Sequence, residues 1–236
     1  MISIIIPAHN ERHNLSKLLP ILNSEASNIL FEVLVMLSCQ STDGSENLEV
    51  APNVKFVKCQ GKGRSVQMNT GASMAAGNVL VFLHADVIPP VSFLNDIEKT
   101  LNARFEAGFF SYRFDKENFW LDINASFTSK DGIFTGGGDQ CLFIKKQTFE
   151  NLGKFNESQA LMEDFEFFKR MKEKKIPYKI INNDLIVSAR KYESNSYLRV
   201  NLSNFLLVVL FKMGISSETL KSIHNKLLKM PYQHNT

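Results

Sequence analysis

Five short, strongly apolar runs divide the first half of the chain into alternating segments. The intervals between them hold apolar residues at helical spacing, such as Leu15, Leu18, Leu19 and Leu22 on one predicted helix face. Strands buried on both faces of a parallel sheet read as continuous apolar runs, and helices connect such strands. The alternation therefore predicts an α/β fold with helices on both sides of a mainly parallel central sheet. The predicted strands are Ile2 to Pro7, Phe31 to Leu37, Val54 to Val57, Val79 to Leu83 and Gly108 to Phe114, the last of which alternates less cleanly and fits an antiparallel addition.

Composition places the chain among ordinary globular proteins. It has 236 residues, of which 44% are hydrophobic and 22% charged, and this predicts one domain over residues 1–236. The net charge of +3 is too small to indicate a nucleic-acid partner. Three cysteines, at positions 39, 59 and 141, show neither a disulfide framework nor metal-ligand spacing. We therefore expect a cytoplasmic protein.

The sequence offers one segment that could meet a membrane. Ile2 to Ile6 lacks a basic n-region and is closed by Pro7, so it predicts a buried strand rather than a secretory signal. Phe205 to Phe211 is continuously apolar, but it is far shorter than the roughly 20 residues of a spanning helix. One interpretation is a helix buried in the core or in a homodimer. The alternative is a peripheral helix at the inner face of the membrane, flanked by Arg199 and Lys212.

The second half of the chain changes character past residue 115. An aromatic-rich stretch at Glu117 to Thr128 precedes a loop at Asp131 to Asp139, which holds three consecutive glycines. A helix with an apolar face is predicted to begin near Leu161. The remaining predicted elements are strands at Cys141 to Lys145, Lys179 to Ile181 and Leu185 to Val187, and helices at Tyr197 to Lys212 and Ser217 to Lys229.

Acidic residues follow the apolar runs at three places. Asp43 and Asp86 come just after the second and fourth predicted strands, and Glu163-Asp164 lies near the start of a predicted helix. In an open parallel sheet the ligand crevice lies outside the carboxyl ends of the strands. The sequence therefore predicts that these acids share one pocket.

Each of these segments has a structural interpretation beside a chemical one. Asp86 can coordinate Mg²⁺ together with phosphate oxygens and water, or it can simply end a strand. The loop that ends at Arg64 can meet phosphate, or it can be an exposed basic turn. Glu163-Asp164 can complement a helix dipole, or it can supply a general base that deprotonates an acceptor hydroxyl.

Five motifs follow the predicted elements in a fixed order. They are Pro7-Ala8-His9-Asn10-Glu11, Ser41-Thr42-Asp43-Gly44-Ser45, Gly63-Arg64 with Gln67 to Ala72, Phe82 to Asp86, and Met162-Glu163-Asp164. With these motifs the chain resembles an inverting family 2 glycosyltransferase with the GT-A fold, over nearly its whole length. More narrowly, it resembles a small bacterial subgroup associated with radical-SAM genes, through His84-Ala85-Asp86, Gly138-Asp139-Gln140, Met162-Glu163-Asp164 and Ser188-Ala189-Arg190-Lys191-Tyr192.

The resemblance implies roles for individual residues. Asp164 would be the catalytic base with Glu163 beside it, and Asp86 with His84 would hold a divalent metal, Mg²⁺ or Mn²⁺. The sugar or acceptor would lie on Gly138, Asp139, Gln140 and Arg190. The nucleotide sugar would contact Pro7, Asn10, Glu11, Ser38, Arg64, Asn69, Ala85 and Asp86.

The resemblance also predicts how the single domain is organised. Residues 1–115 would bind the nucleotide, 116–195 would hold the acceptor and catalytic groups, and 196–236 would form C-terminal helices. The donor would be a nucleoside diphosphate sugar, with a UDP-sugar as the first candidate and an unknown acceptor.

Two positions depart from the family pattern. Ser38 stands where most of the superfamily has an acid that recognises uracil or ribose, and His84 replaces the first acid of the DXD motif. Because of these changes, a second interpretation stays open: a protein that binds a nucleotide sugar but does not transfer the sugar. A nucleotidyltransferase ranks last, because Pro7 to Glu11 is not the glycine-rich loop that such an enzyme places after its first strand.

Overall fold

The fold is built on one eight-stranded sheet of mixed direction. The computed structural model describes residues 1–24, 28–132 and 135–228. Within these residues the strands lie in the order β3-β2-β1-β4-β7-β6-β8-β5. The strands are β1 (Ile2–Ala8), β2 (Phe31–Leu37), β3 (Val54–Lys58), β4 (Val79–Phe82), β5 (Val87–Ile88), β6 (Ala107–Phe114), β7 (Phe143–Lys145) and β8 (Tyr178–Val187).

The N-terminal half of the sheet is parallel, as the apolar runs predict. β1 pairs in parallel with both β2 and β4, and β2 pairs in parallel with β3. Ile4, Ile5 and Ile6 of β1 are fully buried. A central strand that is covered on both faces favours apolar side chains at nearly every position, and this explains why β1 reads as an apolar run. Ser3 is its buried exception, and the Ser3 hydroxyl donates to Glu32 Oε1 at 2.7 Å.

The other half of the sheet is mixed. β7 pairs antiparallel with β4 and β6, whereas β6 pairs in parallel with β8. The prediction that Gly108 to Phe114 is an antiparallel strand is therefore confirmed for its pairing with β7 and wrong for its pairing with β8. The two predicted strands near residues 179 and 185 form one continuous strand, β8, whose pairing with β6 shifts register between Phe110 and Tyr112.

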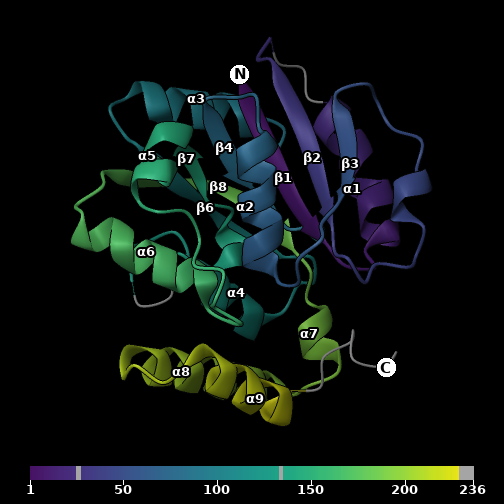
Figure 1. Ribbon diagram of the computed structural model, residues 1–236. Coiled ribbons are helices and arrows are strands. Elements are labelled where there is room, and N and C mark those ends of the chain that lie inside the picture. Colours follow the sequence, from purple (N-terminus) through teal and green to yellow (C-terminus); the bar gives the residue numbers. More distant parts are fainter. Residues whose placement is uncertain (25–27, 133–134, 229–236) are drawn as a thin grey trace.

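Helices cover both faces of the sheet (Figure 1), so the predicted α/β architecture is confirmed. Leu15 of α1 and Phe93 of α3 pack into one core cluster, and Met68 of α2 and Phe167 of α6 pack into the other. The helices are α1 (Arg12–Ser24), α2 (Arg64–Met74), α3 (Phe93–Asn102), α4 (Phe119–Ser126), α5 (Lys146–Asn151), α6 (Glu163–Glu173), α7 (Arg190–Glu193), α8 (Tyr197–Lys212) and α9 (Ser217–Leu227).

α8 and α9 lie side by side at the lower end of the molecule in Figure 1. α8 has the bounds that the sequence predicts, whereas Lys229 of the second predicted helix lies outside the described residues. Leu207 and Val208 of the apolar run are buried, but Phe205 is 50% exposed and Leu206 is 41% exposed. Burial in the core is thus confirmed for one side of α8, and burial of the other side in a homodimer stays a prediction. No helix in the described ranges is long and apolar enough to span a bilayer.

Candidate active site

A cavity of about 590 Å³ opens where β1 and β4 end, between the sheet and the C-terminal helices. Its walls come from segments far apart in the chain. They include Pro7, Ala8 and Glu11 after β1, Arg64 and Gln67 of α2, His84, Ala85 and Asp86 after β4, Gly138, Asp139 and Gln140, Asp164 of α6, and Arg190 of α7. The structure thus gathers most of the predicted site residues around one space.

Four predicted site residues, and the motif acid Asp43, do not line this cavity. Asn10, Ser38, Asp43, Asn69 and Glu163 are absent from its walls. Asp43 accepts hydrogen bonds from the backbone N–H of Arg12, at 2.7 Å, and from the Ser45 hydroxyl, also at 2.7 Å. Although burial opposes it, this hydrogen bonding lowers the pKa of Asp43. Asp43 therefore stabilises the turn that carries it.

Asn10 follows β1 and lies against this turn. It has a φ of 56°, in the left-handed region that asparagine tolerates better than most residues. Its Oδ1 accepts the backbone N–H of Thr42 at 2.9 Å. The strand-end motifs at residues 10 and 41–45 therefore support each other beside the cavity.

Arg64 connects the acids of α6 to the start of α2. Its guanidinium donates to Glu163 through Nε and to Asp164 Oδ2 through Nη2, the latter at 3.1 Å. Its Nη1 lies 3.3 Å from Nε2 of His84. One arginine side chain therefore holds both predicted catalytic acids and touches the motif that follows β4.

The same contacts shift the pKa values of Asp164, Glu163 and Arg64, and so set the charge of each side chain. Burial raises the pKa of Asp164 to about 6, since the charge of Arg64 only partly offsets the loss of water. Burial also opposes ionisation of Glu163, but the attraction of Arg64 outweighs it and lowers the pKa of Glu163. The arginine loses water as well, and the two acids still raise its pKa. Glu163 is therefore the permanent partner of Arg64, and Asp164 is the acid that can exchange a proton near neutral pH.

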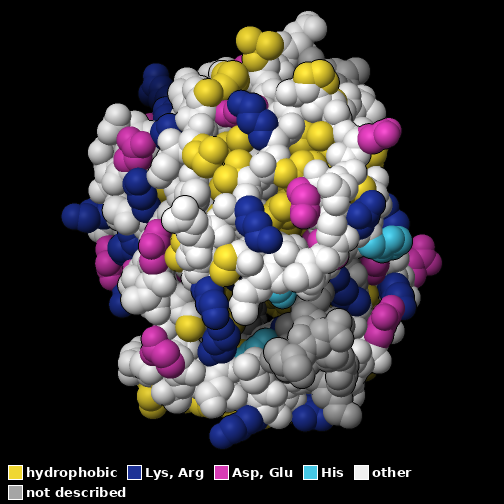
Figure 2. Space-filling model, turned by 45° about the vertical axis from the view of Figure 1, so that its right-hand side comes forward, with side chains coloured by type: hydrophobic (Ala, Val, Ile, Leu, Met, Phe, Trp, Pro, Cys, Tyr) yellow, Lys and Arg dark blue, Asp and Glu magenta, His cyan; other side chains and the backbone are white. Residues whose placement is uncertain are grey.

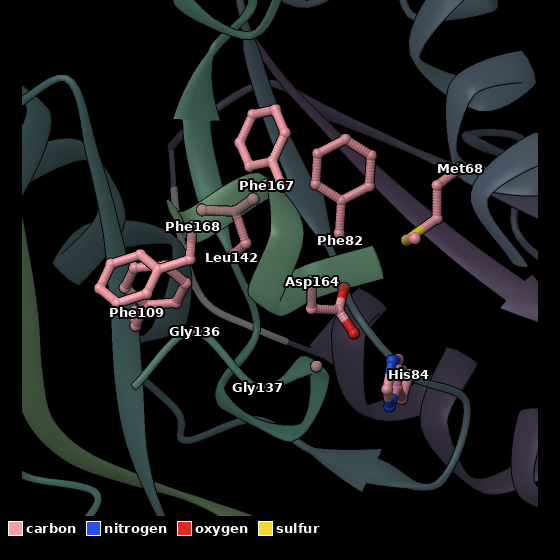
Figure 3. A pocket seen from close by; sticks show the side chains of 11 residues that line it. Met68, Phe82, His84, Phe109, Gly136, Gly137, Leu142, Asp164, Phe167 and Phe168 are labelled. Carbon is pink, nitrogen blue, oxygen red and sulfur yellow. The ribbon is translucent and has the colours of Figure 1, made fainter. Parts of the chain in front are cut away.

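Asp164 also lines a small pocket beside the cavity, drawn in Figure 3. The rings of Phe82, Phe167 and Phe168 lie on one side of its carboxylate, and His84 and Gly137 lie on the other. The chain enters α6 through Met162, which has a φ of 66°, a value rarely adopted by non-glycine residues. This sharp entry brings Asp164 to the cavity wall and leaves Glu163 buried beneath it.

The glycine loop fits closely against this cluster. A Cβ atom on Gly138 would lie 2.6 Å from Asp164 Oδ2 and 2.6 Å from Cε1 of His84. His84 Nδ1 in turn lies 3.4 Å from Asp139 Oδ1. Burial lowers the pKa of His84, but the hydrogen bond with Asp139 and the negative charges of Asp139 and Asp164 together raise it overall. The loop and the histidine therefore form one wall around Asp164.

A second arginine holds the remaining acids. Arg190 Nη2 donates to Asp86 Oδ2 at 2.8 Å and lies 3.3 Å from Glu11 Oε1. Burial raises the pKa of Glu11, with Arg190 and the Asn14 amide acting in the opposite direction. Arg190, which the resemblance places near the sugar or acceptor, thus links the C-terminal segment to the ends of β1 and β4.

The predicted metal ligands do not converge. Asp86 pairs with Arg190, whereas His84 faces Asp139 and Arg64. Across the ranges that the structure describes, no three His, Cys, Asp or Glu side chains form a metal-binding group. A hard divalent ion that takes most of its ligands from phosphate and water needs few protein ligands. The carboxylate of Asp86 on the cavity wall fits such an ion, and His84 does not join it here.

Two amides of α2 fix this helix in place. Gln67 donates to the carbonyl oxygens of Ala8, at 3.0 Å, and Met36, at 2.6 Å. Asn69 donates to the Phe155 carbonyl at 2.9 Å and accepts the Phe155 N–H at 3.0 Å. Asn69 therefore ties α2 to the segment before α6, and Gln67 ties it to the ends of β1 and β2.

Sequence reasoning missed the far wall of the cavity. Its polar side chains come from β6, α4 and the C-terminal helices, and for most of them no motif signals a role. The Asn124 amide donates to Asn201 Oδ1 at 2.8 Å and accepts the Tyr197 hydroxyl at 2.8 Å. These far-wall residues include Tyr112, Asn124, Lys191, Tyr192, Asn201, Asn204 and His224, of which only Lys191 and Tyr192 lie within a recognised motif.

Comparison with known proteins decides the family. Residues 3–176 match the model of glycosyl transferase family 2. The chain belongs to this family. No curated protein sequence matches it significantly. Family membership makes the chain a glycosyltransferase, and the cavity is its candidate active site.

Solved structures support the GT-A fold. A mannosyltransferase from Pyrobaculum calidifontis, PcManGT, in complex with GDP-Man and Mn²⁺, matches with a TM-score of 0.67 and 19% identity, over 95% of this chain and 68% of that one. TarS from S. aureus matches with a TM-score of 0.66 and 14% identity, over 96% of this chain but only 42% of TarS. A shorter form of TarS, residues 1–349 in complex with UDP, matches with a TM-score of 0.64 and 14% identity, over 96% of this chain and 70% of that one.

The fit of the glycine loop gives a test. We expect Gly138→Ala to lower the free energy of unfolding by about 1–3 kcal/mol, because the added methyl group overpacks the space between Asp164 and His84. Gly132→Ala is the matched control, since no atom lies within 4 Å of its added Cβ. Urea denaturation of both variants measures the difference. Equal stability of the two variants would contradict the close fit.

Proposed function

We propose that the chain transfers a sugar from a nucleoside diphosphate sugar to an acceptor hydroxyl, with inversion at the anomeric carbon. The observation that carries this proposal is the position of Asp164, a carboxylate with a pKa raised to about 6 on the wall of the large cavity. A nucleotide-sugar donor is supported by family membership and by neighbours in complex with UDP, or with GDP-Man and Mn²⁺.

The donor would occupy the side of the cavity nearest β1 and β4. Pro7, Glu11 and Ala85 line this side, and the neighbouring turns that hold Asn10 and Ser38 would shape its outer edge. Arg64 would approach the diphosphate, because a guanidinium is a strong partner for phosphate oxygens. A UDP-sugar remains our first candidate, although Ser38 supplies no acid for base recognition.

Asp86 would hold Mg²⁺ or Mn²⁺ together with the donor phosphates. Such an ion neutralises charge on a leaving diphosphate. In the structure Arg190 donates a hydrogen bond to the carboxylate of Asp86. When the donor and its metal ion bind, the metal would replace Arg190 as the partner of Asp86. The guanidinium released from Asp86 would then face the incoming phosphates.

Asp164 would act as the general base. At neutral pH a group with a pKa of about 6 is mostly ionised yet still accepts a proton. In a single displacement the acceptor oxygen forms the new bond to the anomeric carbon, the bond to the diphosphate breaks, and the acceptor proton passes to Asp164. The buried Glu163 would keep Arg64 in place beside it.

The acceptor would enter along the glycine loop. Gly138 and Asp139 line this side of the cavity. The buried amide of Gln140 accepts the Gly136 N–H at 2.9 Å and donates to the Thr128 carbonyl at 3.0 Å, so Gln140 would shape the loop. The narrower likeness to the radical-SAM-associated subgroup stays a prediction.

A nucleotide-sugar-binding protein without turnover is the second candidate. It is favoured by the pairing of Asp164 with Arg64 and of Asp86 with Arg190, which leaves both acids engaged. Turnover separates the two functions. The first step is to screen nucleoside diphosphate sugars for thermal stabilisation with and without Mn²⁺, because this identifies the donor.

With a donor in hand, Asp164→Asn tests the base. We expect the variant to keep donor affinity and to lower kcat by at least about 100-fold, since a positioned base contributes about 10² to 10⁴. Glu163→Gln is the matched control, and we expect a smaller loss of rate from it because Glu163 does not reach the cavity. Near wild-type transfer by Asp164→Asn would show that the pair is structural.

The metal assignment predicts opposite effects at two positions. Asp86→Ala should abolish Mn²⁺-dependent nucleotide binding, whereas Arg190→Gln should raise the affinity for Mn²⁺ alone, because it removes the cation that competes for Asp86. Calorimetry of both variants measures this. Glu98→Ala is the control, since Glu98 is exposed on α3 outside the cavity. Unchanged Mn²⁺-dependent binding by Asp86→Ala would rule the assignment out.

A further inference from the structure

The outer side of α8 is an exposed apolar surface that the active site does not explain. Leu198, Leu202, Phe205 and Leu206 fall at i, i+4, i+7 and i+8, so they share one side of the helix. Leu198 is 69% exposed and Leu202 is 66% exposed. Trp120 of α4 extends this surface, because its ring lies 5.7 Å from that of Tyr197 at the start of α8. We name this set the α8 apolar face: Phe119, Trp120, Leu198, Leu202, Phe205 and Leu206.

The inner side of the same helix is covered. Val200, Leu207 and Val208 are buried, and Leu207 and Val208 lie on the cavity wall with Asn201 and Asn204. α8 is therefore apolar on both sides, and such a helix is normally enclosed on both. Contiguous exposed apolar patches on soluble proteins commonly mark interaction sites. We therefore expect another molecule to cover the α8 apolar face.

The charges on α8 and α9 are mostly positive, whereas the α4 end of the face lies beside the exposed acids Glu117 and Asp122. Between Ser196 and Leu227 the basic residues are Arg199, Lys212, Lys221 and Lys226, and all four are exposed. Glu218 is the acid of this segment. Figure 2 shows Lys or Arg beside hydrophobic side chains along the lower edge of the molecule, where α8 and α9 lie. The occupant should therefore offer both apolar surface and negative charge.

An anionic lipid bilayer meets both conditions. A second copy of the chain would bring a like set of cations into the interface and repel the first. Anionic headgroups attract lysine and arginine, and the acyl boundary accepts leucine and phenylalanine side chains from a helix that lies in the membrane plane. Trp120 and Tyr197 are of the residue types enriched at membrane interfaces. With 16 residues, α8 suits an in-plane position rather than a span.

We propose that the α8 apolar face docks the protein on an anionic phospholipid bilayer, with α8 parallel to the membrane surface. This deepens the proposed function and rests on it in one respect. The inner side of α8 forms one wall of the cavity, so docking places that wall next to the headgroups. The acceptor hydroxyl would then belong to a membrane component.

Vesicle flotation of the purified full chain tests the docking without any donor. We expect the wild type to float with phosphatidylcholine vesicles that contain phosphatidylglycerol, and to float far less with phosphatidylcholine alone. Leu202→Glu with Phe205→Glu should weaken binding at least about tenfold, because it replaces inserted apolar groups with anions. Leu30→Glu is the matched control, since Leu30 is 76% exposed before β2, at the end of the sheet opposite α8 in Figure 1.

Three results would overturn the docking. One is no flotation on phosphatidylglycerol vesicles, and another is equal flotation of the wild type and the double variant. The third is a dimer in light scattering that Leu202→Glu with Phe205→Glu dissociates, since this would assign the face to a second copy. Flotation in a protein that transfers no sugar would support the docking and contradict the proposed function alone.

Discussion

The active site depends on the ion-pair cluster around Arg64. Glu163 and Asp164 begin α6, and burial near an apolar layer opposes a charge on either of them. Arg64 offsets this cost by binding both acids from the start of α2. Gln67 and Asn69 fix α2 to the sheet and to the segment before α6, so the arginine has little freedom to move away. The charge on Arg64 thus determines which of the two acids stays ionised and which can take a proton.

Arg190 gives the cavity a similar link on its other side. It joins Asp86 and Glu11 to α7, just before α8. The two arginines therefore hold four acids, drawn from segments that follow β1 and β4 and from α6. Each pairing places a cation on the side of the cavity where we propose that the donor diphosphate binds. In that proposal, donor binding would exchange these ion pairs for contacts with the diphosphate.

The sequence predicts well those strands and helices that depend on the local pattern of apolar residues. β1, β2 and β4 read as apolar runs because both of their faces are covered, and α8 begins and ends at the predicted residues. β5 has two residues, too few for a periodic signal. The sequence also does not show which side of α8 is exposed. An unbroken apolar run has no polar residues to separate the covered side from the open one.

The site could be predicted in outline but not in its pairings. Strand order brings the acids after β1 and β4 to the edge where the cavity opens. Arg64 and Glu163 are 99 positions apart, however, and Arg190 and Asp86 are 104 apart. No periodicity connects residues at such separations. The far wall is harder still, because it combines single residues of β6, α4, α7, α8 and α9.

A double-mutant cycle between Arg64 and Glu163 tests the central claim most directly. The free energy of unfolding would be measured by urea denaturation for Arg64→Met, Glu163→Gln, the double variant and the wild type. If Arg64 holds the buried acid, Arg64→Met leaves Glu163 without its cation, and Glu163→Gln leaves Arg64 with Asp164 as its remaining acid. The double variant should then lose less than the sum of the two single losses. We predict a coupling energy of at least about 1 kcal/mol. A coupling energy near zero would contradict the account, because the arginine would then not hold the acids of α6 in place.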